Sequence, residues 1–277
     1  MDNINALGLY EEILKTKSCL CVRLDFEKDK IPQKFFKQGE PLFSFNKHIV
    51  DRTHKYTVAY KLNPAFYLEF GEKGLTWLIK TVHYIKRNYP GKLVILDLKF
   101  GDFAFRSEKY AKSIFEEMKA DAVTLSPYIG GEALEPFFNY PGKRGVLMAL
   151  TPNTEGALDF QLTGADFLWE SVISKAVRWK STNVDNLIFV VADGFEEARK
   201  IAPCHFFLVP NIKTDVETGK GSIAEIVKRG ANDVVGLILD YAHDDDFYKK
   251  PATLAHSFQM ETARALHEKK FFKPLKK

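Results

Sequence analysis

The sequence lacks any long hydrophobic run. Its longest apolar stretches, GVLMAL and LIFVVA, are much shorter than the roughly 18 residues that a membrane-spanning helix needs. The N-terminal segment MDNINALGLYEEILK is acidic and amphipathic, without the basic region, apolar centre and small-residue cleavage site of a secretory signal. We therefore expect neither a membrane span nor export.

Cysteine is scarce as well. The 277 residues include three cysteines, Cys19, Cys21 and Cys204, and the first two form a C-x-C pair. An odd number with this spacing argues against a disulfide framework, which is typical of a reducing compartment. The histidines are scattered without metal-ligand spacing. The sequence thus predicts a cytoplasmic protein, and no metal site is expected.

Clustered charge of one sign is also missing. Lys and Arg total 40 against 36 Asp and Glu, a net charge of +4, and the basic residues are scattered apart from the C-terminal KFFKPLKK. Nucleic-acid binding needs basic residues gathered on one face, so no nucleic-acid partner is expected. Apolar residues make up 45% of the chain, which excludes a disordered protein.

What the sequence does contain is a series of short apolar runs, each followed by an amphipathic segment. The runs are almost continuously apolar, as in strands that are buried on both faces of a parallel sheet. The segments between them have helical spacing, as in GLTWLIKTVHYIKRNY. Eight runs occur, at 18–25, 56–63, 92–99, 121–127, 145–151, 186–193, 205–211 and 234–242.

Eight strand–helix units in a chain of this length predict a (β/α)8 TIM barrel, which typically has about 250 residues. We expect one domain over residues 1–277, with an N-terminal helix at about 5–16 and a basic tail at about 268–277. An open doubly wound sheet is the alternative, but it needs a Gly-rich turn after the first strand, and LDFEKDK contains none.

Charged residues interrupt the apolar runs at the strand ends, where a barrel carries its active site. Lys61 lies near the end of the second run, and Asp97 and Lys99 end the third. Asp97 and Lys99 are two positions apart, so they should point to the same side and meet Lys61 on the neighbouring strand. A lysine flanked by aspartates stays protonated and can act as a positioned acid. A structural ion pair would explain any single charge, but several buried charges together favour function.

The motifs around these charges resemble a known family. LDLKFGD carries D-x-K-x-x-D (Asp97, Lys99, Asp102), and it occurs with CVRLDFEKDKIP, FNKHIVD and VAYKLNPAFYLEFGEKG. Together they are similar to the orotidine 5′-monophosphate decarboxylase family, and most of all to its longer bacterial branch (type 2). The similarity continues through VTLSPYIGGEALEPFF, LTPNTEGALDFQL and HFFLVPNI, and so covers nearly the whole chain. D-x-K-x-x-D also occurs in sugar-phosphate decarboxylases and synthases with the same barrel fold. The Y-K-x-N-x-A-F-Y segment around Lys61 is the feature that favours the orotidine 5′-monophosphate decarboxylase family over these enzymes.

The resemblance implies a cofactor-free decarboxylation of orotidine 5′-phosphate to UMP by a homodimer. Lys99 would protonate C6 after carbon dioxide leaves, Asp97 would lie beside the substrate carboxylate, and Lys61 would bridge the network to the ribose. Asp102 would come from the partner subunit, across paired barrel mouths, and Asp25 would accept a hydrogen bond from a ribose hydroxyl. The other substrate-binding residues that we expect are Asn63, Thr151, Asn153 and Lys213.

The chain departs from the family where the phosphate binds. The Gly- and Gln-rich loop after the seventh strand is replaced by VPNIKTDVETGKGS, with Asn211 and Lys213 at glycine positions. The Ser-Ser-Arg-like segment after the eighth strand is replaced by LDYAHDDDF, so we expect Asp240 and Asp244–Asp246 to repel a phosphate. The Gly of the family's CVGLD is Arg23.

Two interpretations follow from these departures. The chain is either a working decarboxylase with new phosphate contacts or a homologue that no longer binds the nucleotide. In the first case Lys213, Lys220 or Arg106 could supply the charge for the phosphate. In the second case the chain would be a pseudoenzyme, an interaction protein or an enzyme for another ligand.

Overall fold

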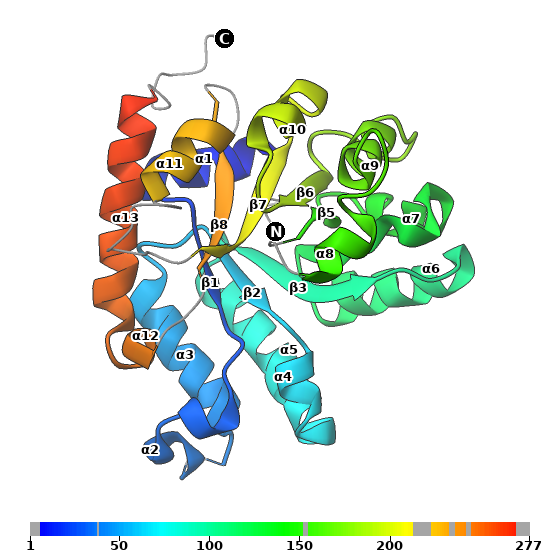
Figure 1. The fold of residues 1–277 in the computed structure, drawn as a ribbon. Helices are drawn as coiled ribbons and strands as arrows, with labels where there is room; N and C mark the ends of the chain where they lie inside the picture. Colours follow the sequence, from blue (N-terminus) through cyan, green and yellow to red (C-terminus); the bar gives the residue numbers. More distant parts are fainter. Residues whose placement is uncertain are drawn as a thin grey trace.

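Each of the eight apolar runs forms a strand, and the strands close into a parallel barrel (Figure 1). This computed structural model describes residues 6–37, 39–151, 155–212, 223–232, 236–241 and 245–269. Each strand pairs with the next one along the chain, and β8 closes the barrel on β1. The predicted (β/α)8 barrel is confirmed. Its strands are β1 Leu20–Arg23, β2 Ala59–Leu62, β3 Leu93–Phe100, β4 Ala122–Leu125, β5 Arg144–Leu150, β6 Leu187–Val191, β7 Phe206–Ile212 and β8 Leu237–Tyr241.

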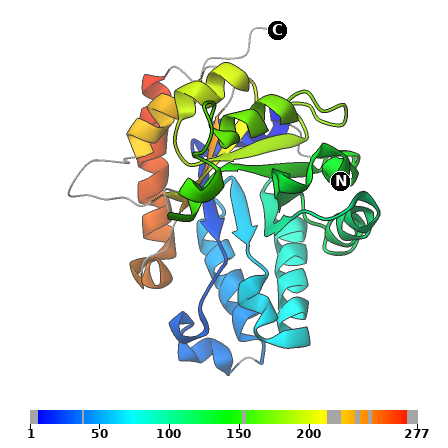
Figure 2. The same cartoon turned by 45° about the vertical axis from the view of Figure 1, so that its right-hand side comes forward.

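Helices surround the barrel and connect its strands (Figures 1 and 2). Helix α1 precedes the first strand, where a helix at about 5–16 was predicted. None of the described helices is both long and apolar enough to cross a membrane. The helices are α1 Ala6–Thr16, α2 Gln33–Phe36, α3 Pro41–Thr53, α4 Ala65–Leu68, α5 Gly71–Asn88, α6 Ala104–Lys112, α7 Gly131–Phe138, α8 Glu155–Phe160, α9 Leu168–Ala176, α10 Phe195–Ile201, α11 Ile223–Gly230, α12 Asp245–Lys249 and α13 Pro251–Glu268, with short helical turns at Lys28–Lys30, Ser113–Glu117 and Pro127–Ile129.

The strands supply the hydrophobic core. Every residue of β2, β4, β6 and β8 is buried, as expected for strands between a packed barrel interior and a layer of helices. Cys19 and Cys21 are buried at β1, whereas Cys204 is exposed in the turn before β7; all three are free thiols. Each fully buried Leu, Ile, Val or Phe contributes about 1.5–3 kcal/mol, so the core can accommodate a few buried charges.

Helices α4 and α5 pack closely and so hold the loops that follow β1 and β2. A Cβ atom on Gly74 of α5 would lie 1.7 Å from the carbonyl oxygen of Tyr67 in α4. The Tyr67 hydroxyl donates to the carbonyl of Leu24 at 2.8 Å and accepts a hydrogen bond from Asn46 Nδ2 at 2.8 Å. The lack of a side chain at Gly74 therefore sets the position of α4 against the chain that leads to Asp25.

We expect Gly74→Ala to lower the free energy of unfolding by about 1–3 kcal/mol, because the added methyl group would meet a backbone carbonyl rather than a movable side chain. The matched control is Thr76→Ala, an exposed position on the same helix, for which the change should stay within about 0.5 kcal/mol. Urea unfolding measures both. Equal stabilities for the two variants would contradict the tight contact between α4 and α5.

Candidate active site

Four charged side chains from β2, β3 and β8 meet at the carboxyl end of the barrel. Lys61 Nζ lies 2.9 Å from Asp97 Oδ2 and 3.1 Å from Asp240 Oδ2. Lys99 Nζ lies 2.7 Å from Asp97 Oδ1. Lys61, Asp97 and Asp240 are buried, whereas 48% of the Lys99 side chain is exposed. Lys61, Asp97 and Lys99 thus lie together, as their positions in the sequence predicted. Of the three, Lys99 is the side chain that a ligand at the mouth of the barrel can reach.

Lys99 owes its position to an irregular stretch of β3. Its φ is 52°, a left-handed conformation that is uncommon for residues other than glycine and is concentrated at functional sites. The pairing of β3 with β4 shifts register between Leu96 and Phe100. The Lys99 amide donates to Thr124 Oγ1 at 2.8 Å, and that hydroxyl donates to Asp97 Oδ1 at 2.8 Å. Thr124 therefore holds both Lys99 and Asp97 in place.

Mutual attraction keeps the central pair charged. Burial alone would raise the pKa of Asp97, but the Lys61 and Lys99 ammonium groups outweigh it and hold that pKa well below its usual range. Burial would likewise lower the pKa of Lys61, but Asp240 and Asp97 raise it above its usual range. Both groups are therefore ionised at neutral pH.

A second set of contacts joins β1, β7 and β8. Arg23 Nε lies 3.4 Å from Asp25 Oδ2 and 3.9 Å from Asp240 Oδ1, and Arg23 Nη1 donates to Asn211 Oδ1 at 2.9 Å. Asp240, which we expected to repel a phosphate, is buried, and its carboxylate pairs with Lys61 and Arg23. Burial nevertheless raises the pKa values of Asp240 and Asp25, even though Lys61 and Arg23 oppose the rise.

A cavity of about 270 Å³ lies over these charges. Each strand from β2 to β8 contributes at least one residue to its lining, as expected for inward-pointing residues at the mouth of a barrel. The cavity also reaches Arg23, Asn63, Lys99, Thr151 and Asn211. The strand layer consists of Lys61, Asp97, Thr124, Met148, Val190, Leu208 and Asp240.

The remaining predicted site residues differ in their surroundings. Asp25 Oδ1 accepts a hydrogen bond from the Asn63 amide at 2.5 Å, and Asn63 Oδ1 accepts one from the Ala65 amide at 3.0 Å. Thr151 lines the cavity and donates its hydroxyl to Gln161 Oε1 at 3.0 Å. Outside the described residues lie Asn153, Lys213, Lys220 and Asp244, and also the side chains of Asp245 and Asp246.

Asp102 does not join the network within the described chain. Its carboxylate accepts hydrogen bonds from the Phe103 amide at 2.7 Å and from Arg106 Nη1 at 3.1 Å, and these contacts lower its pKa.

Across the part of the chain that the structure describes, no group of three or more His, Cys, Asp or Glu residues has positions suited to a metal ion.

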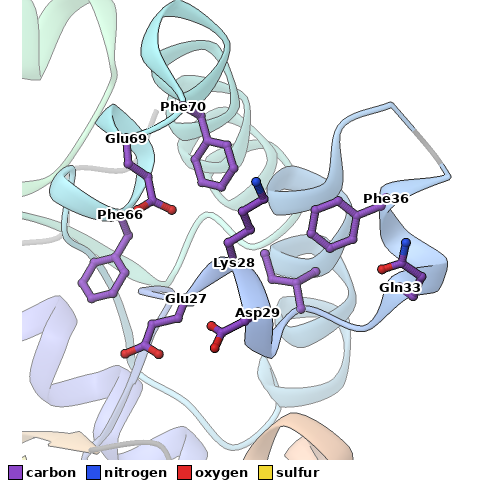
Figure 3. Close-up of a pocket in the computed structure, with 9 residues that line it drawn as sticks. Glu27, Lys28, Asp29, Gln33, Phe36, Phe66, Glu69 and Phe70 are labelled. Atoms are coloured by element: carbon purple, nitrogen blue, oxygen red, sulfur yellow. The ribbon is translucent and has the colours of Figure 1, made fainter.

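A larger cavity, of about 830 Å³, lies apart from this network (Figure 3). It is lined by the segment after β1 and by α4 and the residues that follow it, and its lining includes three phenylalanine rings, Phe36, Phe66 and Phe70, and the Glu27, Asp29 and Glu69 carboxylates. None of the Lys61, Asp97, Lys99 and Asp240 side chains lines it. The smaller cavity is therefore the candidate active site, because it combines enclosure by the strand ends with the charged groups.

Sequence reasoning missed Arg23, Thr124 and Asp240 as partners within the site. Each is a polar residue inside an otherwise apolar run, close to the end of its strand. That signal was present in the sequence, but it does not say which polar residues face each other across the barrel.

Lys61→Met should lower the free energy of unfolding by about 3–5 kcal/mol, because it leaves the Asp97 and Asp240 carboxylates buried without their shared partner. Asp240→Asn should cost no more than about 1 kcal/mol, since Lys61 keeps Asp97 and the site loses a carboxylate whose ionisation is opposed by burial. Unfolding in guanidinium chloride measures the free energy of unfolding of the two variants and of the unaltered protein.

The pH dependence gives a separate check on the Lys61 variant. Without Lys61 the pKa values of the two carboxyls should lie above those of the unfolded chain, so the folded state gains protons more readily. Lowering the pH from about 7 to about 5 should then recover part of the stability lost in Lys61→Met. Similar costs for Lys61→Met and Asp240→Asn, with no recovery at the lower pH, would show that Lys61 does not neutralise both carboxylates.

The whole chain is similar to several known proteins. An orotidine 5′-phosphate decarboxylase of Phocaeicola vulgatus is 44% identical over 244 residues, covering 86% of this chain and 87% of that protein. One of Parabacteroides distasonis is 40% identical over 280 residues, covering 96% and 98%. The solved OMP decarboxylase of Leishmania donovani superposes with a TM-score of 0.72 at 27% identity, covering 92% of this chain and 99% of that one. Residues 18–235 match one family throughout, and the chain belongs to the orotidine 5′-phosphate decarboxylase / HUMPS family.

Proposed function

We propose that this protein decarboxylates orotidine 5′-phosphate to UMP and carbon dioxide without a cofactor. The observation that carries the proposal is the Asp97 carboxylate, held between the Lys61 and Lys99 ammonium groups at 2.9 and 2.7 Å on the floor of the mouth cavity. The named relatives at 40% and 44% identity support a decarboxylase over a homologue that has lost the activity.

The geometry suits a reaction that forms a carbanion. The bond between C6 and the substrate carboxylate breaks, carbon dioxide leaves, and the electron pair stays on C6. The Lys99 ammonium stabilises that charge and then transfers a proton to C6, after which the lysine recovers a proton from water. Asp97 would face the substrate carboxylate, and their repulsion would favour departure of carbon dioxide.

The neighbouring residues would position the substrate. Lys61 holds Asp97 in its ionised form and extends toward the ribose, and Asp25 would accept a hydrogen bond from a ribose hydroxyl. Asn63, Thr151 and Asn153 would complete the binding of the nucleoside, and Lys213 would contribute charge near the phosphate. Of these, Asn63 and Thr151 line the cavity beside Lys61 and Lys99.

Lys99→Ala should abolish turnover and leave the fold intact, because it removes the proton donor from a half-exposed position with no buried side chain to repack. The measurement is the spectrophotometric loss of orotidine 5′-phosphate. Lys109→Ala, at an exposed lysine of α6, is the matched control and should keep full activity.

Two results would count against this role. Undiminished turnover in the Lys99 variant would remove the proposed donor. Absence of any calorimetric heat with UMP for the unaltered protein would favour the alternative, a folded homologue that does not bind the nucleotide.

We further propose that the protein acts as a homodimer in the cytoplasm. Exposed aromatic side chains follow Asp102 at the start of α6 and lie in the helical turn after β4: Phe103 and Phe105 are each 61% exposed, and Tyr128 is 86% exposed. The two segments are close together, since a Cβ atom on Gly101 would lie 3.3 Å from the Ile129 side chain. A patch of this kind on the mouth face fits a second copy of the chain, and Asp102 would then enter the partner's network. The free thiols of Cys19, Cys21 and Cys204 fit a reducing compartment.

A mixing experiment tests the shared site. Asp102→Asn and Lys99→Ala should each be inactive alone, but subunit exchange creates hybrid dimers in which one site has both intact residues. At equal amounts, random pairing predicts a return of about a quarter of the unaltered activity. If Asp102 served its own subunit, no hybrid would contain an intact site and activity would stay absent after mixing.

A further inference from the structure

The pairing of β3 with β4 is interrupted by a bulge at the active site. Between the paired positions on either side of the register shift, β3 contains residues 97–99, whereas β4 contains Thr124 alone. Extra residues of this kind leave ladder hydrogen bonds unmade, and they often redirect a side chain at an active site. Lys99 is the last residue of this bulge, and its φ of 52° is left-handed. A group that fixes the bulge therefore also fixes the Lys99 side chain.

The side chain of Thr124 crosses the bulge. Thr124 is 1% exposed, and its Oγ1 lies 2.8 Å from the Lys99 amide nitrogen and 2.8 Å from Asp97 Oδ1. A backbone amide can only donate, so the hydroxyl accepts the first hydrogen bond and directs its single proton to the Asp97 carboxylate. Both hydrogen bonds need the hydroxyl, and a side chain without one can form neither.

These contacts form a closed ring with the Lys99 side chain. Lys99 Nζ lies 2.7 Å from the same Asp97 oxygen that accepts the Thr124 hydroxyl. The other Asp97 oxygen is held by Lys61 at 2.9 Å. The backbone end and the ammonium end of Lys99 are therefore both tied to the pair formed by Thr124 and Asp97.

We propose that Thr124 is a positioning residue for the transfer of a proton from Lys99 to the substrate. Its hydroxyl maintains the left-handed conformation of Lys99, which persists only where the surroundings hold it. Without the hydroxyl, the Lys99 backbone can relax to an extended conformation, and the ammonium group moves. Thr124 acts through Lys99 and neither gives nor takes the proton. This inference rests on the proposed function for the identity of the reaction.

Steady-state kinetics of the full chain with orotidine 5′-phosphate test the proposal. Thr124→Val keeps the shape of the side chain and removes the hydroxyl. We expect kcat to fall by about tenfold to a hundredfold, the effect of displacing a reacting group by about 1 Å. KM should change by less than about threefold, because the interactions that bind the substrate are kept.

Two further variants serve as controls. Thr124→Ser retains the hydroxyl and should keep kcat within about threefold of the value for the unaltered protein. Thr262→Val removes another buried hydroxyl, which donates to the Phe258 carbonyl within α13, and it should change neither kcat nor KM. If Thr124→Val fails to fold, Thr124→Ala replaces it, since the Ala and Ser variants differ by the hydroxyl alone.

Three results would overturn the proposal. An unchanged kcat in Thr124→Val would show that the hydroxyl is not needed. Equal kcat values for Thr124→Ser and for the variant without the hydroxyl would reduce Thr124 to a packing role. A raised KM with an unchanged kcat would mean that Thr124 binds the substrate instead of positioning Lys99.

Hydrogen exchange at the Lys99 amide, measured by NMR, separates this inference from the proposed function. The amide should exchange more slowly in the unaltered protein and in Thr124→Ser than in Thr124→Val, because a hydrogen-bonded amide is protected. If the unaltered protein does not decarboxylate orotidine 5′-phosphate, the proposed function fails, and this difference in exchange still supports Thr124 as the group that positions Lys99. Equal exchange in the three proteins would overturn that role, whether or not the protein is active.

Discussion

The structure depends on one buried cation. Lys61 lies between Asp97 and Asp240, with both carboxylates within 3.1 Å. None of the three groups could be buried alone, because an isolated charge in the core costs several kcal/mol even after relaxation. The closed barrel provides the one arrangement in which the ends of β2, β3 and β8 bring them together. The charge network therefore depends on the closed barrel, and within it Lys61 keeps both buried carboxylates paired.

Around this buried group of charges, cations and carboxylates alternate. Lys99 pairs with Asp97, and Arg23 lies near Asp25 and Asp240. Among the described residues, the network thus contains three cations, Arg23, Lys61 and Lys99, and the three carboxylates of Asp25, Asp97 and Asp240. Arg23, Asn211 and Asp240 all lie at positions where the sequence departs from the family's motifs, and Arg23 contacts each of the other two. Together they form a local rearrangement that preserves charge balance.

The backbone conformation and the ion pairs together fix the position of the Lys99 side chain. Lys99 adopts a left-handed conformation at a register shift, and Thr124 fixes its amide and the Asp97 carboxylate. Strain of this kind persists only where the surroundings hold it. The half-exposed Lys99 can thus meet a ligand while the buried members beneath it stay in place.

The sequence by itself determined the barrel, the order of its strands and the meeting of Lys61, Asp97 and Lys99. These follow from local information, because apolar runs define strands, and parallel strands in chain order place their ends side by side. Only the tertiary structure decided the partner of Asp240, which is a buried counterion of Lys61. It also decided the contact between Arg23 and Asn211, and the separation of Asp102 from the network within the described chain. These contacts depend on the closure of β8 against β1, where residues far apart in the chain share one cavity, and no local pattern encodes that register.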